Sequence, residues 1–338
     1  MASMDYRASG VDIDAGNETV RRIKLLARKT YTPGVLSGVG SFGGLFALDP
    51  AIPSPVLVAS ADGVGTKLKV AFLAGMHRTI GVDLVNHCVN DILVQGARPL
   101  FFLDYLATGR LAPDVAEEIV QGVSEACLAN GCALLGGETA EMPGFYAPGE
   151  YDVAGFIVGV VPRARIIDGR SVVPGDTLIA LPSSGLHTNG YSLARRIVFD
   201  VLKLSVDSHV EELGETVGEA LLRTHRSYLP LVGPLLEAGH IKGMAHITGG
   251  GITENLPRTL PAGCAFSLDR QSWTIPPLFQ WLQRAGQLDD AEMFRAFNMG
   301  VGMVLVCAPE HAPVLVTSLG PSAWVLGAVG DGSVFHRS

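Results

Sequence analysis

The chain has 338 residues, of which 48% are hydrophobic and 17% charged. Because charged residues usually make up about 25%, most of this chain must be packed into folded domains, and its length predicts about two of them. The formal net charge is -8, and the absence of a basic run argues against a nucleic-acid partner.

Two further observations concern the compartment. Apolar runs are interrupted before the roughly 18 residues that a membrane span needs, and the N-terminus carries Asp5, Arg7 and Asp12 where a secretory signal would be apolar. The sequence therefore predicts a cytoplasmic protein without a membrane anchor. The cysteines form no C-x-x-C pair, so we expect reduced, mostly buried thiols.

Helix and strand patterns alternate in the first half. Helical periodicity over residues 17–29 precedes a stretch at 33–44 rich in Gly, Ser and Pro, which predicts a mobile flap. The elements expected next are a strand at 56–60, a helix at 81–95, a strand at 100–106, a helix at 113–130, and strands at 132–135 and 153–161. This order predicts a mixed α/β domain with crossover connections between some strands.

A break falls between Pro162 and Gly175, where charged residues and a Pro-Gly-Asp turn lie together. We therefore expect two domains, at residues 1–170 and 171–338. The second restarts with a buried strand at 177–181, repeats the order of strand, Gly-rich loop and helix at 183–196 and 246–260, and closes with strands at 301–306 and 324–329.

A possible phosphate-binding turn follows the first buried strand. It contains Asp62, Gly63, Gly65, Thr66 and Lys67. Ligands commonly bind at this place in open α/β sheets, and free backbone N–H groups would hold phosphate there. The segment does not match the Gly-x-x-x-x-Gly-Lys-Ser/Thr phosphate loop. An ordinary turn with a solvated Lys67 is the equally weighted alternative.

One face of the helix at 81–95 carries four polar side chains: Asp83, His87, Asn90 and Asp91. No Lys or Arg occurs between residues 78 and 98, so the carboxylates have no local partner of opposite charge. Oxygen ligands of this kind suit Mg²⁺ that also holds nucleotide phosphates. The alternative is an ordinary acidic surface, and a lone histidine such as His87 more often packs or donates a hydrogen bond.

A third acidic group follows the strand at 132–135, as Gly136, Gly137, Glu138, Thr139 and Glu141. If the three carboxylate groups meet at one edge of a sheet, their mutual repulsion requires a cation. The sequence thus predicts convergence of acids on a metal ion.

Two Gly-rich loops in the second half precede short helical patterns. The candidate ligand-binding residues in them are Ser184, Gly185, Thr188, Asn189, Gly190, Thr248, Gly249, Gly250 and Gly251. Helix N-termini of this kind bind anions, and arginines at 195, 196 and 258 would suit a phosphorylated substrate. Simple capping turns are the alternative. His187 and His246 are candidate bases or phosphate ligands, although a lone histidine is more often structural.

Taken in order, six motifs closely resemble those of the phosphoribosylformylglycinamidine cyclo-ligase family, also called aminoimidazole ribonucleotide synthetase. They are Gly-Val-Asp-Ile-Asp-Ala-Gly-Asn at 10–17, Asp-Gly-Val-Gly-Thr-Lys at 62–67, Val-Asn-Asp at 89–91, Gly-Gly-Glu-Thr-Ala-Glu-Met-Pro-Gly at 136–144, His-Thr-Asn-Gly-Tyr-Ser-Leu at 187–193 and His-Ile-Thr-Gly-Gly-Gly at 246–251. The resemblance runs from about residue 10 to the end of the chain.

The resemblance implies a step of purine biosynthesis in which ATP drives closure of formylglycinamidine ribonucleotide to 5-aminoimidazole ribonucleotide, with release of ADP and phosphate. It implies a two-domain α/β (α+β) fold, with an N-terminal ATP-binding and dimerisation domain and a second α/β domain that contributes to the substrate site. It also implies a homodimer whose N-terminal sheets join across the interface, with ATP bound there.

The family's residue roles are carried over by matching motifs. Asp62, Asp91 and Glu138 would hold Mg²⁺ and ATP phosphates, with Lys67 and Lys24 as counter-charges. The turn glycines, Thr66 and Gly137 would line the nucleotide, and residues 37–44 would be the flap over it. Apart from the resemblance, ring closure needs a base near the attacking nitrogen, and His187 is the candidate for it. Where the family's pattern is expected to have Met, this chain has His87, so the resemblance gives His87 no role.

Other functions stay open at this stage. A related small-molecule kinase, such as thiamine-monophosphate kinase, shares the superfamily motifs and would leave phosphate on its product. Selenophosphate synthetase would need a reactive Cys or selenocysteine near the N-terminus, whereas the first cysteine here is Cys88. A regulatory nucleotide binder would bind ATP without turnover. The number of metal ions and the extent of flap motion cannot be deduced from the sequence.

Overall fold

A computed structural model describes residues 11–40 and 42–332. The chain forms two compact units: the described residues up to Ile92 with Arg98–Pro162, and Leu93–Ala97 with the described residues from Arg163 onward. Asp5 and Arg7, which argue against a secretory signal, lie outside the described residues. So do Gly10, the first residue of the first motif, and Ser41 of the predicted flap. Within the described part, no helix has both the length and the apolar character needed to span a membrane.

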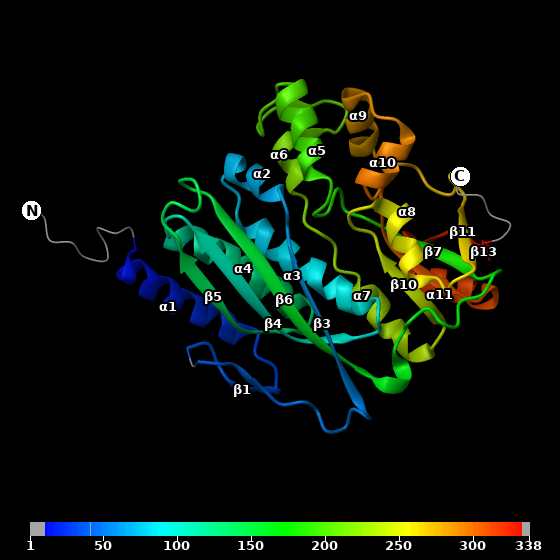
Figure 1. Ribbon diagram of the computed structural model, residues 1–338, viewed down its shortest axis with the longest axis horizontal. Coiled ribbons are helices and arrows are strands. Elements are labelled where there is room, and N and C mark those ends of the chain that lie inside the picture. Colours follow the sequence, from blue (N-terminus) through cyan, green and yellow to red (C-terminus); the bar gives the residue numbers. More distant parts are fainter. Residues whose placement is uncertain (1–10, 41, 333–338) are drawn as a thin grey trace, which may run out of the picture. The chain divides into compact units, whose positions relative to one another are not determined.

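The first unit is built on a four-stranded sheet in the order β3-β6-β4-β5 (Figure 1). The strands are β3 (Pro55–Gly63), β6 (Tyr151–Pro162), β4 (Arg98–Thr108) and β5 (Ala133–Glu141). Only β4 and β5 are parallel, and α4 (Pro113–Ala129) connects them. The predicted strands are confirmed, whereas crossovers are fewer than expected, because β6 pairs antiparallel with both β3 and β4.

Three more helices complete the first unit: α1 (Ile13–Lys29), α2 (Lys67–Ala74) and α3 (Arg78–Leu93). The Asp12 side chain caps α1 by accepting from the backbone N–H groups of Asp14 and Ala15. Helices α3 and α4 cross closely, because a Cβ added at Gly81 would lie 2.0 Å from the Ile119 carbonyl oxygen. Glycine is therefore required at this crossing.

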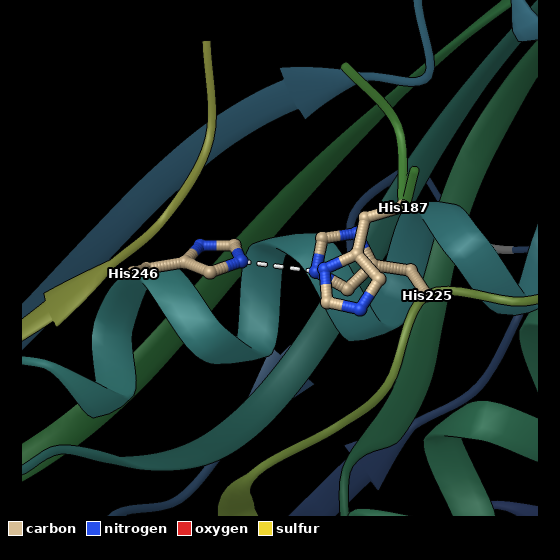
Figure 2. Close-up of side chains that lie close together, drawn as sticks. All are labelled: His187, His225 and His246. Carbon is tan, nitrogen blue, oxygen red and sulfur yellow. Dashed lines mark hydrogen bonds between the residues drawn. The ribbon is translucent and has the colours of Figure 1, made fainter. Parts of the chain in front are cut away.

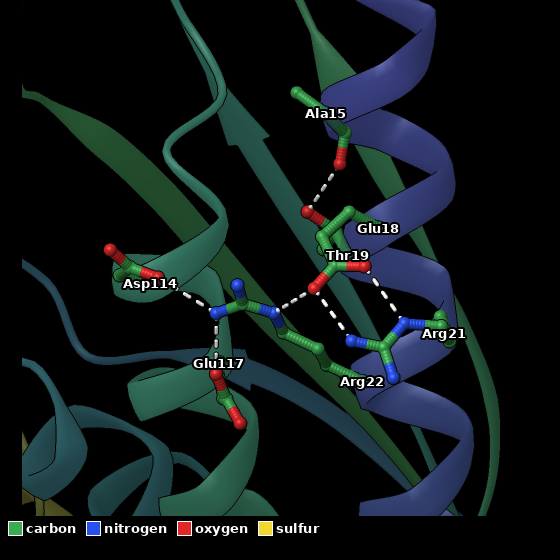
Figure 3. A network of polar contacts seen from close by, with 7 residues as sticks. All are labelled: Ala15, Glu18, Thr19, Arg21, Arg22, Asp114 and Glu117. Carbon is green, nitrogen blue, oxygen red and sulfur yellow. Dashed lines mark hydrogen bonds and ion pairs between the residues drawn. The ribbon is translucent and has the colours of Figure 1, made fainter.

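Arg22 fixes α1 on α4 (Figure 3). Its Nη1 contacts Asp114 Oδ1 and Glu117 Oε2, each at 2.7 Å, while its Nε donates to Glu18 Oε1 at 2.6 Å. One guanidinium thus joins three carboxylates from two helices that are distant in sequence. This network sets the orientation of α1, which carries Lys24.

The Gly-rich stretch predicted as a flap is framed by a small antiparallel pair, β1 (Val35–Ser37) and β2 (Leu45–Phe46). The Phe46 and Phe101 ring centroids are 5.4 Å apart, so the base of this hairpin packs on β4. Regular strand pairing therefore anchors both ends of the stretch, and its mobility stays a prediction.

The second unit contains a five-stranded, wholly antiparallel sheet in the order β10-β12-β7-β13-β11. The strands are β7 (Thr177–Pro182), β10 (Ile241–His246), β11 (Cys264–Leu268), β12 (Val301–Cys307) and β13 (Trp324–Asp331). The predicted strands at 177–181, 301–306 and 324–329 are confirmed. Strand β12 is buried along its whole length and lies between two other strands, which explains its continuous apolar sequence.

Short helices and turns surround this sheet. They are η1 (Arg163–Arg165), α5 (Tyr191–Arg195), the π-helix η2 (Arg196–Val201), α6 (Val217–Leu222), α7 (Leu229–Val232), η3 (Gly233–Ala238), α8 (Gly251–Asn255), η4 (Leu256–Thr259), α9 (Pro277–Gly286), α10 (Asp290–Ala296), η5 (Pro309–His311) and α11 (Ala312–Leu319), with a hairpin of β8 (His209–Val210) and β9 (Glu215–Thr216). The cysteines are free thiols, and all except Cys264 are buried, as predicted.

Candidate active site

Asp62 and Asp91 lie together in the first unit, joined by His87. The Nε2 of His87 is 3.0 Å from Asp62 Oδ2 and 3.8 Å from Asp91 Oδ2, and Ser60 Oγ donates to Asp91 Oδ2 at 3.0 Å. Alternation along β3 puts Ser60 and Asp62 on the same face, and residues 87 and 91 are one turn apart on α3. The side chains of Asp62 and Asp91 are 45% and 25% exposed. They form an accessible pair of carboxylates.

The electrostatics of this cluster follow from its geometry. Burial by itself lowers the pKa of His87, but the hydrogen bond to Asp62 and the negative charge of Asp91 outweigh it, and the net pKa is raised. The two carboxylates therefore stabilise the cationic form of His87 by more than burial destabilises it. The family resemblance implied no role for His87, and its contact with Asp62 could not be predicted, since it depends on how β3 and α3 pack together.

Lys67 is neither solvated nor exposed. Its Nζ lies 2.7 Å from Asp83 Oδ2, and both side chains are 0% exposed. Burial lowers the pKa of Lys67, while Asp83 acts to raise it. The alternative of a turn with a solvated Lys67 is wrong. Asp83 has no partner of opposite charge near it in the sequence, as expected, and it pairs instead with Lys67 from another helix, α2.

Gly63, Gly65 and Thr66 form the turn that leads from β3 into α2. The Gly63 N–H donates to Asp62 Oδ1 at 2.7 Å, and Gly65 has a positive φ of 55°. Thr66 is the residue before α2. The predicted phosphate-binding turn therefore lies directly beside the Asp62 carboxylate.

Glu138 does not join Asp62 within one chain. Residue pairing runs from Gly63 through Ala154 and Tyr105 to Glu138, so Asp62 and Glu138 lie at the same end of the sheet but on its two opposite edge strands. Three strand spacings correspond to about 14 Å. Because Glu138 shares its row with Gly63, it faces the side opposite to Asp62. The expected convergence at one edge is absent among the described residues.

Two neighbours of Glu138 have structural contacts. Glu141 accepts hydrogen bonds from the backbone N–H groups of Asp12 and Leu111, each at 2.7 Å, which ties the start of α1 to the sheet. Gly137 pairs with Asp104, and a Cβ at residue 137 would lie 1.7 Å from Asp104 Oδ1. Burial raises the pKa of Asp104 to about 7. Asp104 was not predicted as a site residue, because it stands alone within an apolar strand.

Lys24 lies against the flap. A Cβ added at Gly40 would be 2.6 Å from both Cε and Nζ of Lys24. Gly40 also has a positive φ of 117°, which disfavours any other residue there. The ammonium group of Lys24 is thus placed beside the middle of the Gly-rich stretch, as a counter-charge under a flap would be.

The first Gly-rich loop of the second unit is held by its own side chains. Ser184 Oγ donates to the Thr224 carbonyl oxygen at 2.5 Å, and Asn298 Nδ2 donates to the Gly185 carbonyl oxygen at 2.9 Å. Gly190 has a positive φ of 77° and packs against Phe297. A cavity of about 120 Å³ lies beside Ser184 and Gly185. The loop is therefore ordered next to an open space.

The second loop is held by Asn255. Its Nδ2 donates to the carbonyl oxygens of Thr248, Gly249 and Gly251 at 3.4, 3.0 and 2.8 Å. Asn189 connects the loops: a Cβ at Gly249 would lie 3.4 Å from Asn189 Oδ1. The buried Nδ2 of Asn189 has no hydrogen-bond partner among the described residues. The candidate substrate-binding residues of the two loops are thus brought together within the second unit.

Three buried histidines cluster beside these loops (Figure 2). The rings of His187 and His225 stack with centroids 4.0 Å apart, and His225 Nε2 lies 2.9 Å from His246 Nε2. His187 Nε2 accepts from the Ser184 backbone N–H at 3.1 Å. His225 was not predicted, because it belongs to no motif and lies between α6 and α7.

Two family models match the chain. Residues 49–161 match "AIR synthase related protein, N-terminal domain", and residues 173–337 match "AIR synthase related protein, C-terminal domain". A phosphoribosylformylglycinamidine cyclo-ligase of Trichlorobacter lovleyi is 55% identical over 328 residues, which cover 96% of this chain and 94% of the relative. One from Desulfitobacterium hafniense is also 55% identical and covers 96% of each chain.

Among solved structures, a thiamine-monophosphate kinase from Stenotrophomonas maltophilia superposes with a TM-score of 0.70 at 19% identity, covering 93% of this chain and 94% of the other. At this level of identity the likeness shows a shared fold.

Proposed function

The chain belongs to the phosphoribosylformylglycinamidine cyclo-ligase family, and from this premise we propose how its residues serve the ATP-dependent closure of formylglycinamidine ribonucleotide to 5-aminoimidazole ribonucleotide. The observation that carries the function is the full-length match to curated cyclo-ligases at 55% identity. A related kinase is the weaker alternative, since the kinase likeness is limited to the fold at 19% identity.

The chemistry requires activation of an amide. Its carbonyl carbon is a poor electrophile and its oxygen a poor leaving group. Phosphorylation of the formyl oxygen by ATP removes both difficulties, and the ribosyl-bearing amidine nitrogen then attacks the carbon and expels phosphate. Phosphoryl transfer depends mainly on positioning and on neutralisation of charge. The residues of the first unit supply both.

Asp62 and Asp91 fit a divalent metal ion, because two part-exposed carboxylates lie on either side of His87 with 3.0 and 3.8 Å contacts. We propose that they hold Mg²⁺, which when bound supplies positive charge to ATP phosphates. The turn at Gly63, Gly65 and Thr66 would present backbone N–H groups to the same phosphates. Lys24 would add a counter-charge from beneath the flap.

Lys67 serves this site indirectly. Its ion pair with Asp83 places the first residue of α2 against α3. We propose that Lys67 sets the position of the phosphate-binding turn, rather than contacting phosphate in the described conformation.

A homodimer would use the face of the four-stranded sheet that carries Glu138. On that face Leu57 of the edge strand β3 and Phe156 of the inner strand β6 are 56% and 44% exposed, so two large apolar side chains are open to a partner. Joining two such faces would bury them and place Glu138 at the interface, where the family's ATP site is expected. Light scattering tests this arrangement. A dimeric wild type that becomes monomeric with Phe156→Asp would support it, and a monomeric wild type would contradict it.

The two Gly-rich loops would bind the ribonucleotide. Thr188, Asn189 and Gly190 lie on the first loop and Thr248–Gly251 on the second, with the buried amide of Asn189 between them. His187 can act as the base only if the loop moves, because its Nε2 already accepts from Ser184. In the described conformation, the neutral ring carries its proton on Nδ1.

The reaction is tested with ¹⁸O in the formyl group of the substrate. Phosphorylation of that oxygen predicts that the label appears in inorganic phosphate and is absent from the closed product. A kinase would retain the phosphoryl group on its product, and a regulatory binder would release none. Unlabelled phosphate formed together with closed product would exclude the phosphorylated-amide mechanism.

A further inference from the structure

A continuous hydrogen-bonded chain runs through the second unit from Thr188 to His246. Thr188 Oγ1 lies 3.2 Å from His225 Nδ1, and His225 Nε2 lies 2.9 Å from His246 Nε2. His225 is 0% exposed, whereas Thr188 and His246 are each 6% exposed. All three side chains are therefore buried, and His225, the middle member, is buried completely.

The contact between the two Nε2 atoms determines how many protons lie between the rings of His225 and His246. At 2.9 Å one ring must donate and the other accept, so a single proton lies between them when both rings are neutral. If His225 donates from Nε2, its Nδ1 accepts from the Thr188 hydroxyl. If His246 donates instead, His225 donates from Nδ1 to Thr188. The chain therefore has two neutral proton arrangements, and passing from the first to the second requires one proton to enter at Thr188 and one to leave from His246.

A metal ion explains the cluster less well, although each of the three histidines could offer one nitrogen to such an ion. The rings of His187 and His225 are inclined by only 20° at 4.0 Å between centroids. Nitrogen lone pairs lie in the ring plane, so two nearly parallel stacked rings cannot direct them to a common point. The His187 Nε2 lone pair is also engaged by the Ser184 N–H.

We propose that His225 relays the proton released by ring closure from Thr188 to His246, an inference that rests on the proposed function. As the C–N bond forms, the substrate nitrogen loses its proton to Thr188 Oγ1. Thr188 gives its own hydroxyl proton to His225 Nδ1, and His225 gives its Nε2 proton to His246. The threonine stays a hydroxyl, His225 stays neutral, and His246 becomes an imidazolium that later releases the proton to water.

Several features support this direction. Thr188 and Asn189 belong to the loop proposed to hold the substrate, and His246 ends β10 immediately before the second loop. The stacked ring of His187 keeps His225 in the plane that reaches both partners. His225 itself contacts no reacting atom, so it acts by passing a proton between two neighbours.

The test combines two substitutions with a matched control. His225→Gln retains one hydrogen-bond donor and one acceptor but cannot exchange them as imidazole does, and His225→Phe retains the stacked ring alone. His240→Gln is the control, because His240 stacks on His311 at 3.9 Å outside this cluster. We expect both His225 variants to lose about 100-fold or more in kcat, the range for acid–base assistance, with nucleotide KM within threefold of wild type.

A measurement on the wild type keeps the test independent of folding. Nitrogen-15 NMR should show a through-hydrogen-bond coupling between the Nε2 atoms of His225 and His246. Wild-type kcat in His225→Gln would overturn the relay, as would the absence of that coupling or stoichiometric zinc in the purified enzyme. An inactive wild type would instead contradict the proposed function, because the relay is judged only against an active enzyme.

Discussion

The buried pair of Lys67 and Asp83 separates a structural role of Lys67 from a role in nucleotide binding. The two side chains are fully buried with 2.7 Å between Nζ and Oδ2. Removing one partner of a buried pair leaves a charge without its counter-ion and typically costs about 3–5 kcal/mol, whereas replacing both with apolar residues is often close to neutral. We therefore predict that Lys67→Met and Asp83→Leu each destabilise the first unit by about 3–5 kcal/mol.

The double variant is the informative one. Lys67→Met with Asp83→Leu should recover most of the stability lost in either single variant, as measured by urea unfolding of all four proteins. At about 1.4 kcal/mol per tenfold change, each single loss corresponds to a folding constant lowered roughly 100-fold or more. Nucleotide KM is then measured in the refolded double variant. A normal value assigns Lys67 a structural role, and a large increase shows that its charge also reaches the nucleotide.

Two outcomes would refute this reasoning. Single variants that lose less than about 1 kcal/mol would show that the pair behaves like an exposed one. A double variant as unstable as the sum of the two singles would show that the side chains do not interact.

Three further predictions follow from individual contacts. Gly81→Ala should lower the unfolding free energy by about 2 kcal/mol or more, because its Cβ would lie 2.0 Å from the Ile119 carbonyl oxygen. The control is Gly16→Ala in α1, which has open space around its Cβ and should be neutral or slightly stabilising. Equal changes in unfolding free energy for the two variants would contradict the argument. The raised pKa of Asp104, about 7 against a usual 3.8, keeps its carboxyl mostly protonated in the folded protein below pH about 7. Its contribution to stability is therefore complete below pH about 4 and is lost as pH rises through about 7, by up to ~1.4 kcal/mol per pH unit, and Asp104→Asn should flatten that dependence in thermal melts. Asp62→Asn and Asp91→Asn should each raise the Mg²⁺ concentration needed for half-maximal activity at least about tenfold with unfolding unchanged, and normal activity at low Mg²⁺ would exclude both as ligands.

The sequence predicted most regular elements because their apolar periodicity is local. Strand β12 is one continuous buried run, and α3 begins three residues before its predicted start. The partner of Asp83 was not predictable, because Lys67 comes from another helix and the pairing depends on packing. The same holds for Glu138: its motif is clear in the sequence, but its distance from Asp62 depends on the order of strands in the sheet.

The two Gly-rich loops of the second unit were also predictable only in part. The glycines at 190 and 250 were predicted to belong to Gly-rich loops that lead into helices, and they directly precede α5 and α8 with positive φ angles of 77° and 92°. The asparagines at 255 and 298, which hold the loop carbonyl groups, were missed, since a single amide side chain carries no periodic signal. His225 was missed for the same reason, although its two hydrogen bonds give it the most specific surroundings of the three histidines.

The strand order of the second unit has a consequence for synthesis on the ribosome. Strand β7 is made first, yet its neighbours in the sheet are β12 and β13, which lie more than a hundred residues later in the chain. Strand β11 pairs only with β13, so it lacks a partner until the last of these strands has emerged. All four strands of the first unit's sheet are complete by Pro162. The first sheet can therefore form as soon as Pro162 has emerged, whereas β7 and β11 have to wait for β12 and β13 before they can pair.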